Sequence, residues 1–313
     1  MTVTNRPAFP SRHLRCFKVI HPRISELMLG LLVCFTHQCL PKAAAQELPE
    51  NLRTENLVAW CIVPFDAEKR GSEARAKMLQ ELGLKKLAYD WREEHVPTWD
   101  DELKALTEAN VELTAFWCSS SLEPSKHPGN LRIFEFLKKN KVQTQLWFML
   151  PTGALDRIED PKERLNASSK AVRDLAEAAA ELGCSVGLYN HGGWPGKPST
   201  LVAIMKELQD LENVGLVYNF HHAHEDLAEF PEALKIMRPY LMCLNLNGMT
   251  VGGAKILPLA EGKLDQKILQ WILDVNYQGP IGILDHRNEL DARESLQQNL
   301  IGLQKVWMQL QSK

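Results

Sequence analysis

Residues 185–222 read SVGLYNHGGWPGKPSTLVAIMKELQDLENVGLVYNFHH and contain one full repeat of the pattern that decides the fold. Two short apolar runs of β type, 185–189 and 214–219, are separated by a longer amphipathic stretch. Parallel strands need a long crossover of this kind, which is usually a helix. The segment therefore predicts a strand, a helix and a second parallel strand, with polar residues directly after each strand.

The same alternation of apolar runs and amphipathic stretches extends in both directions along the chain. The other strand candidates are 57–63, 86–90, 112–117, 144–150, 240–246 and 281–285. Helix signals lie between the strand candidates, as where Asp160-Pro161 opens a helix over 161–182 that Gly183 ends. The alternation predicts eight strand–helix units joined by crossover helices.

Eight such units in about 260 residues match the usual size of a closed barrel. We therefore expect an α/β fold, a single (β/α)8 TIM barrel over residues 47–313. A doubly wound open sheet is the alternative, but Pro64-Phe65-Asp66 stands where its glycine-rich phosphate loop would follow the first strand.

The first 46 residues have a different pattern. A basic segment is followed by an apolar stretch over 27–35 and by the small residues 43–45, and the basic residues are Arg12, Arg15, Lys18 and Arg23. This order is typical of a signal peptide that is cleaved after export. Because the apolar stretch is too short to span a bilayer, we expect residues 1–46 to be an export segment. The mature protein is then periplasmic or secreted, without stable membrane insertion.

Composition limits the classes of partner. The chain has 313 residues, of which 45% are hydrophobic and 24% charged, enough for one large buried core. Its formal net charge is -3, and it has no dense run of Lys and Arg, so nothing indicates binding to nucleic acid. A small ligand such as a carbohydrate is the expected partner.

The cysteines beyond residue 46 do not resemble a metal site. No CxxC pair occurs among them, and all lie in or beside strand-like runs: Cys61, Cys118, Cys184 and Cys243. We expect buried free thiols, with a disulfide as the alternative if two strands bring a pair together.

Polar residues cluster directly after the late strands. They occupy the segments 189–194 (YNHGGW), 219–224 (NFHHAH), 245–248 (NLNG) and 285–289 (DHRNE). The active site of such a barrel lies at the carboxyl ends of its strands. Gathering these polar groups at one barrel mouth costs desolvation free energy unless a polar ligand or a metal binds there. The pattern therefore predicts a ligand site.

The residue types at this mouth suggest a sugar-binding site that transfers protons. Asn side chains suit sugar hydroxyls, His can move protons near neutral pH, and aromatic rings cover the apolar face of a sugar. We expect the catalytic residues to be His191, His222 and Asp285. We expect the substrate-binding residues to be Trp117, Trp147, Asn190, Trp194, Asn219, His224, Asn245, Asn247, Lys255 and His286.

These motifs resemble the xylose isomerase-like TIM-barrel superfamily, which includes sugar phosphate isomerases/epimerases and endonuclease-IV-type enzymes. The resemblance covers the whole expected barrel and is most specific at 188–193 (LYNHGG), 217–222 (VYNFHH) and 256–265 (ILPLAEGKLD). It implies a barrel fold. In the best-known branches it also implies a divalent metal that polarises a hydroxy-ketone while carboxylates shuttle a proton.

The chain departs from the family pattern at the metal ligands. Tyr189 stands in place of a Glu, Asn219 in place of an Asp, Asn245 in place of a His, and Asp285 in place of a Glu. Hard cations such as Mg²⁺ and Mn²⁺ need anionic oxygen ligands, and two of the carboxylates are absent. The family resemblance therefore implies a divergent member without the usual carboxylate ligands.

Two alternatives for a metal remain open on the sequence. His191, His222 and Asp285 form a set of two histidines and a carboxylate that can hold zinc or another transition metal. The other alternative is that no metal is bound and the mouth binds a carbohydrate directly.

Two functions from different classes follow. The first is an exported sugar-active enzyme of isomerase, epimerase or lyase type that acts on a free or oxidised sugar or a glycoside fragment by proton transfer. Export argues against a sugar phosphate as its substrate. The second is a non-catalytic carbohydrate-binding barrel that has lost the family metal site.

Overall fold

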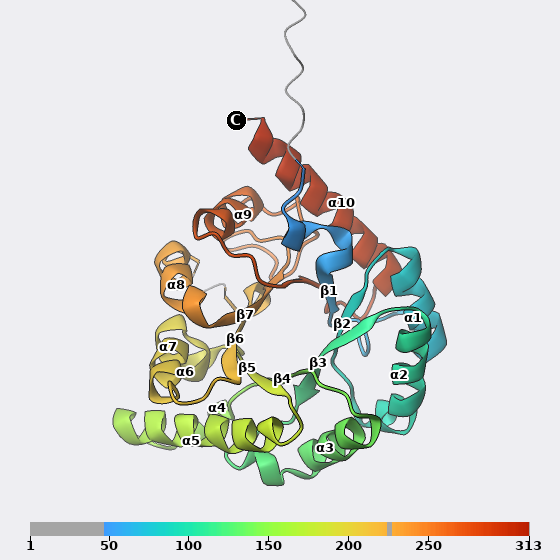
Figure 1. The fold of residues 1–313 in the computed structure, drawn as a ribbon. Helices are drawn as coiled ribbons and strands as arrows, with labels where there is room; N and C mark the ends of the chain where they lie inside the picture. Colours follow the sequence, from blue (N-terminus) through green and yellow to red (C-terminus); the bar gives the residue numbers. More distant parts are fainter. Residues whose placement is uncertain (1–46, 224–226, 313) are drawn as a thin grey trace, which may run out of the picture. The chain divides into compact units, whose positions relative to one another are not determined.

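Eight parallel strands close into a barrel in chain order, from β1 to β8 (Figure 1). The structure, a computed structural model, describes residues 47–223 and 227–312, so the expected export segment lies outside the described residues. The strands are β1 (Leu57–Trp60), β2 (Lys86–Tyr89), β3 (Glu112–Cys118), β4 (Gln145–Phe148), β5 (Ser185–Tyr189), β6 (Val214–Asn219), β7 (Leu241–Leu246) and β8 (Ile281–Leu284). The expected (β/α)8 barrel and its eight strand positions are confirmed.

Helices surround the ring of strands, as Figure 1 shows. The helices are α1 (Ser72–Glu81), α2 (Trp99–Glu108), α3 (Pro128–Asn140), α4 (Thr152–Leu155), α5 (Pro161–Ala180), α6 (Gly193–Gly196), α7 (Pro198–Glu207), α8 (Phe230–Met237), α9 (Asp265–Asp274) and α10 (Ala292–Gln311). The expected start of α5 at Asp160-Pro161 is confirmed. The Asp160 carboxylate caps the helix by accepting hydrogen bonds from the backbone N–H groups of Lys162 and Glu163 at 2.9 and 2.8 Å.

Side chains alternate between two apolar layers because successive residues of a strand point to opposite faces. The larger layer lies between strands and helices and includes Leu188, Tyr218 and Phe148. The smaller layer fills the barrel interior with the side chains of Val58, Trp60, Cys61, Ala88, Ala115, Trp147, Tyr189, Val217, Cys243 and Leu284. The interior is thus a packed core, and any ligand site must lie above it at the carboxyl ends of the strands.

The described cysteines have free, buried thiols, as expected, rather than disulfides: Cys61, Cys118, Cys184 and Cys243. In the same part of the chain, no helix combines the length and hydropathy needed to cross a membrane.

Candidate active site at the barrel mouth

A cavity of about 190 Å³ opens above the interior layer at the carboxyl ends of the strands. It is lined by Trp60, Cys61, Phe65, Asp90, Arg92, Trp117, Met149, Tyr189, His191, Asn219, His222 and His286. Pockets for drug-sized ligands span roughly 300–1,000 Å³, so this one suits a ligand of about one sugar ring. Of the expected site residues, the structure brings together Trp117, His191, Asn219, His222 and His286.

Aromatic and amide side chains form the floor of the cavity. The Tyr189 hydroxyl accepts a hydrogen bond from Trp60 Nε1 at 3.1 Å and another from Asn219 Nδ2. The Trp117 ring packs edge-on against Tyr189, with ring centroids 4.9 Å apart. Burial raises the pKa of Tyr189 well above its usual value, so the hydroxyl keeps its proton and can donate it to a ligand oxygen.

Four imidazoles from three strand ends form a row along one side of the mouth. His191 follows β5, His221 and His222 follow β6, and His286 follows β8. Ring centroids are 4.3 Å apart for His191–His222, 4.4 Å for His221–His222 and 4.7 Å for His221–His286. Phe65 packs on the outer end of the row, 4.0 Å from His286.

The imidazoles that line the cavity are neutral near pH 7. Burial lowers the pKa of His222 to about 2, and repulsion between its protonated form and protonated His191, His221, His286 and Lys255 acts in the same direction. Burial also lowers the pKa of His191 and His286. A neutral imidazole has one donor and one acceptor nitrogen, so these groups can bind hydroxyl and carbonyl oxygens.

Two residues at the mouth have backbone conformations that non-glycine residues rarely adopt. Cys61 has φ 57° and His286 has φ 64°. Their backbones are joined by a hydrogen bond of 3.2 Å from His286 N to the Cys61 carbonyl oxygen, where β1 and β8 end. Backbone strain of this kind concentrates at functional sites, and here it turns both side chains towards the cavity.

Three of the expected substrate-binding amides have buried structural contacts instead of lining the cavity. Asn190 Nδ2 donates to the Asn219 carbonyl at 3.1 Å, and its Oδ1 accepts from Asn219 N at 2.6 Å, which joins the ends of β5 and β6. Asn245 Oδ1 accepts from the Cys243 thiol at 3.5 Å. Asn247 Nδ2 donates to the Lys255 carbonyl at 3.0 Å and thereby supports the loop after β7.

Other expected binding residues also lie outside the cavity lining. Trp147 is fully buried in the interior layer, with its ring 4.7 Å from Trp60. Trp194 packs outside the mouth, where the Arg164 guanidinium lies 5.3 Å above its ring. Lys255 is exposed in the loop after β7, and its positive charge contributes to lowering the pKa of His222. His224 lies outside the described residues.

Asp285 is buried on the opposite face of β8 from the cavity. Leu284 belongs to the interior layer, so the next side chain points outward. The Asp285 carboxyl accepts a hydrogen bond from the Ser295 hydroxyl of α10 at 2.7 Å and lies 3.4 Å from Arg287 Nε. The structure therefore separates Asp285 from the histidines with which the sequence grouped it.

Asp90 is a cavity residue that the sequence interpretation did not select. It follows β2, lines the cavity and is 3% exposed. The sequence interpretation selected polar residues after the late strands only. Asp90 directly follows β2, so the same positional rule applies to it. Since Ala88 belongs to the interior layer, the strand alternation also predicts that Asp90 points inward.

The donors do not fit the metal site that the family resemblance implied. Tyr189 and Asn219, which replace carboxylates, hydrogen-bond to each other. Within residues 47–223 and 227–312, no three His, Cys, Asp or Glu side chains are grouped so that they could hold a metal ion. The structure does not bring His191, His222 and Asp285 together as a ligand group, because the Asp285 carboxyl bonds to Ser295 of α10.

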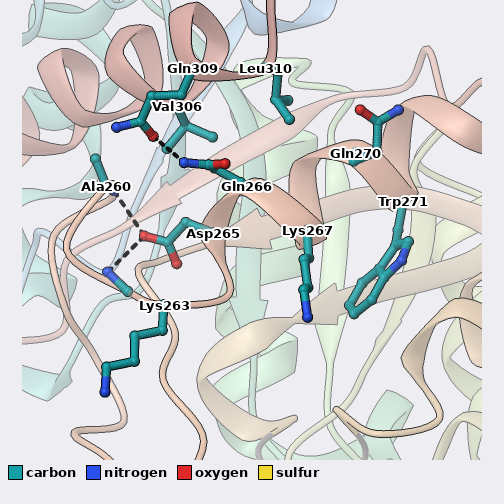
Figure 2. A pocket seen from close by; sticks show the side chains of 11 residues that line it. Ala260, Lys263, Asp265, Gln266, Lys267, Gln270, Trp271, Val306, Gln309 and Leu310 are labelled. Carbon is teal, nitrogen blue, oxygen red and sulfur yellow. Dashed lines mark hydrogen bonds between the residues drawn. The ribbon is translucent and has the colours of Figure 1, made fainter. Parts of the chain in front are cut away.

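A second, larger cavity of about 500 Å³ lies outside the barrel between α9 and α10 (Figure 2). Its buried carboxylate, Asp265, accepts hydrogen bonds from Met249 N, Ala260 N and Gly262 N at 2.7–2.9 Å. Gln266 and Gln309 bridge the two helices at 2.6 Å. Because these polar groups already bond to the protein, the cavity at the barrel mouth is the stronger candidate for a ligand site.

Comparison with known proteins places this geometry in a family. A family model described as xylose isomerase-like TIM barrel matches residues 45–301. Comparison with curated proteins gave no significant match.

Several solved structures are similar to the chain. The apo 3-keto-D-glucoside 4-epimerase YcjR from E. coli is 17% identical with a TM-score of 0.57, covering 80% of this chain and 98% of that one. The IOLI protein with a bound zinc atom is 14% identical with a TM-score of 0.65, covering 82% and 99%. The D-psicose 3-epimerase from Clostridium cellulolyticum H10, solved with D-tagatose, is 13% identical with a TM-score of 0.53, covering 82% and 97%. At these identities the likeness shows the fold.

Proposed function

Because the chain belongs to the xylose isomerase-like TIM barrel family, we propose that it is a sugar-active enzyme of isomerase, epimerase or lyase type. Its substrate is a free or oxidised sugar or a glycoside fragment, bound at the barrel mouth and transformed by proton transfer. We further propose that residues 1–46 direct export to the periplasm or out of the cell, where sugar phosphates are not the usual substrates.

The observation that carries this proposal is the composition of the cavity. Within about 190 Å³ it combines an aromatic surface, neutral imidazoles, a protonated phenol and a buried carboxyl group. An aromatic ring such as Trp117 can cover the apolar face of a sugar while the polar groups bind its hydroxyls. Solved structures of similar fold include a 3-keto-D-glucoside 4-epimerase and a D-psicose 3-epimerase, which supports a carbohydrate substrate.

The residues at the mouth have distinct roles in this proposal. His191 and His222, as neutral imidazoles, donate and accept hydrogen bonds with the sugar oxygens. The Tyr189 hydroxyl, held by Trp60 and Asn219, donates to the oxygen that becomes negatively charged when a carbon-bound proton leaves. The substrate carbonyl is thus activated by hydrogen bonds from this chain.

A non-catalytic carbohydrate-binding barrel is the second candidate. Two observations favour it: Tyr189 and Asn219 bond to each other where the family carries carboxylates, and His222 does not titrate near neutral pH. Recognition alone needs hydrogen-bonding groups but no proton carrier.

Proton NMR in D₂O separates the candidates. The protein is incubated with D-tagatose, D-fructose and a 3-keto-D-glucoside, and the C–H signals next to the carbonyl are followed with time. Enzyme-dependent exchange or a new sugar supports the enzyme. Saturable binding without exchange favours the binding barrel, and absence of both for every sugar contradicts a sugar function.

A matched pair of variants locates the binding site. Trp117→Ala should weaken sugar binding, whereas Trp271→Ala, which removes a half-buried ring from α9 outside the barrel, should not. Equal affinities for Trp117→Ala and the wild type, measured by calorimetry, would place the sugar elsewhere.

A further inference from the structure

Asp90 is held at the mouth with one oxygen available to a ligand. Its Oδ1 accepts a hydrogen bond from Val63 N at 3.3 Å. Its Oδ2 is buried and has no hydrogen-bond partner within the described part of the chain. A buried carboxyl oxygen without a partner costs desolvation free energy, which a ligand that binds to it would offset.

The nearest arginine does not neutralise this carboxyl by a direct ion pair. Arg92 Nη1 donates instead to the carbonyl oxygens of Asp90 and Trp91 at 2.9 and 2.8 Å. Its guanidinium carbon lies 5.4 Å from the centre of the Phe65 ring. Arg92 thus lies at the rim of the cavity, where its charge still acts on Asp90.

Several titratable groups interact electrostatically with the Asp90 carboxyl. They are the side chains of Cys61, Arg75, Tyr89, Arg92 and Tyr189. Burial and the neighbouring Asp90 raise the pKa of the Cys61 thiol, and burial raises the pKa values of both tyrosines, so all three are protonated at neutral pH. Asp90 is therefore the group of this set that can exchange a proton near pH 7.

Its environment gives the carboxyl a pKa suited to that task. Burial raises the pKa of Asp90 to about 7, against the smaller lowering effects of Arg92 and the backbone N–H of Val63. General acid–base catalysis is most efficient when the pKa of the group lies near the operating pH.

We propose that Asp90 is the catalytic general base of this site and removes a proton from the carbon next to the sugar carbonyl. This inference rests on the proposed sugar-active function. The C–H bond breaks and its proton joins Asp90 Oδ2. The electron pair forms a carbon–carbon double bond, and the carbonyl electrons move onto oxygen as an enediolate.

The groups opposite Asp90 stabilise this intermediate and allow the reverse step. The enediolate oxygen accepts hydrogen bonds from Tyr189 and from the neutral imidazole of His222, both of which line the same cavity. The proton on Asp90 exchanges with solvent, and transfer of a solvent-derived proton from Asp90 to carbon reverses the electron movements and regenerates the carboxylate. The cycle needs no oxidant, reductant or third reactant.

Deuterium exchange into the three sugars tests this role in Asp90→Asn, Asp90→Glu and Asp210→Asn. Asp90→Asn keeps the acceptor for Val63 N but cannot take a proton, so exchange should fall by roughly 10²–10⁴-fold. Sugar affinity, measured by calorimetry, should change only a few-fold. Asp90→Glu should retain part of the rate. Asp210→Asn makes the same chemical change at an exposed carboxylate paired with Arg173, remote from the mouth, and should exchange like the wild type.

The pH profile and the exchange rates decide between the possible outcomes. Wild-type exchange should rise as pH increases through about 7, because the carboxylate is the active form, and this rise should disappear in Asp90→Asn. Exchange that survives in Asp90→Asn overturns the role of Asp90 and leaves the sugar-active function standing. Absence of exchange in the wild type with every sugar overturns both.

Discussion

Replacement of Asp90 by Asn should change how the stability of the protein depends on pH. The carboxyl group is 3% exposed, and burial raises its pKa from 3.8 to about 7. Asn has nearly the same shape and can still accept the hydrogen bond from Val63 N, but it does not ionise. The variant therefore removes the titration while leaving the main contact in place.

The sign of the effect follows from proton binding. Between pH 3.8 and about 7 the folded protein keeps a proton on Asp90 that the unfolded chain has released. Wild-type stability from this group is therefore complete below the unfolded pKa and is lost as pH rises towards the folded pKa. Each pKa unit corresponds to about 1.4 kcal/mol, so the loss is about 4 kcal/mol in total and about 2–3 kcal/mol between pH 5 and pH 8.

Urea unfolding followed by tryptophan fluorescence at pH 5, 6, 7 and 8 measures this loss. The free-energy difference between Asp90→Asn and the wild type should shift by about 2–3 kcal/mol in favour of the variant from pH 5 to pH 8. Other titrating groups cancel in that difference. Asp210→Asn is the control. Because Arg173 lowers the pKa of Asp210, replacement of this carboxylate by an amide should not stabilise the variant relative to the wild type as pH rises. Curves for Asp90→Asn and wild type that stay parallel within about 0.5 kcal/mol would show that the folded protein does not hold a proton on Asp90 in this pH range.

Three other predictions follow from the site. The His222 imidazole should remain neutral from pH 8 down to pH 5, because burial lowers its pKa to about 2, and a titration near 6.5 in its NMR signals would contradict this. Asn190→Ala should lower the free energy of unfolding, measured with urea, by about 2–4 kcal/mol, because it removes two buried hydrogen bonds to backbone groups of Asn219. A change under about 1 kcal/mol would show that these bonds contribute little. Proton exchange on the sugar should survive EDTA, since the described residues group no three metal ligands, whereas loss of exchange that Mn²⁺ or Zn²⁺ restores would establish a metal-dependent reaction.

The eight strands were predictable because each has an apolar run with a recognisable end. The runs 185–189 and 214–219 match β5 and β6 residue for residue. Other predicted strands were too long at one end, as where the run 57–63 continues past Trp60 into the positive φ of Cys61. The backbone changes direction at Cys61 while the residues remain apolar, so hydropathy did not predict the end of β1 at Trp60.

The site was predicted less completely, and the misplacements share a cause. Asp285 and Asn190 directly follow β8 and β5, but both point away from the barrel axis. Trp147 lies inside β4, one layer below the cavity. Position after a strand identifies the mouth. The alternation of side chains and the layer that each reaches decide which residues meet a ligand.

The period of the pattern, the number of strand–helix units and the gathering of polar groups at one end could be predicted from the sequence, because hydrophobic periodicity and turn signals are local. The tertiary structure was needed to bring Asp90, which follows β2, into one cavity with His191 and His222, which follow β5 and β6. It also placed the Asp285 carboxyl against α10, where it accepts a hydrogen bond from the Ser295 hydroxyl. The meeting of Asp90 with the histidines depends on closure of the barrel, which brings together residues 101 and 132 positions apart through the register and tilt of every strand between them.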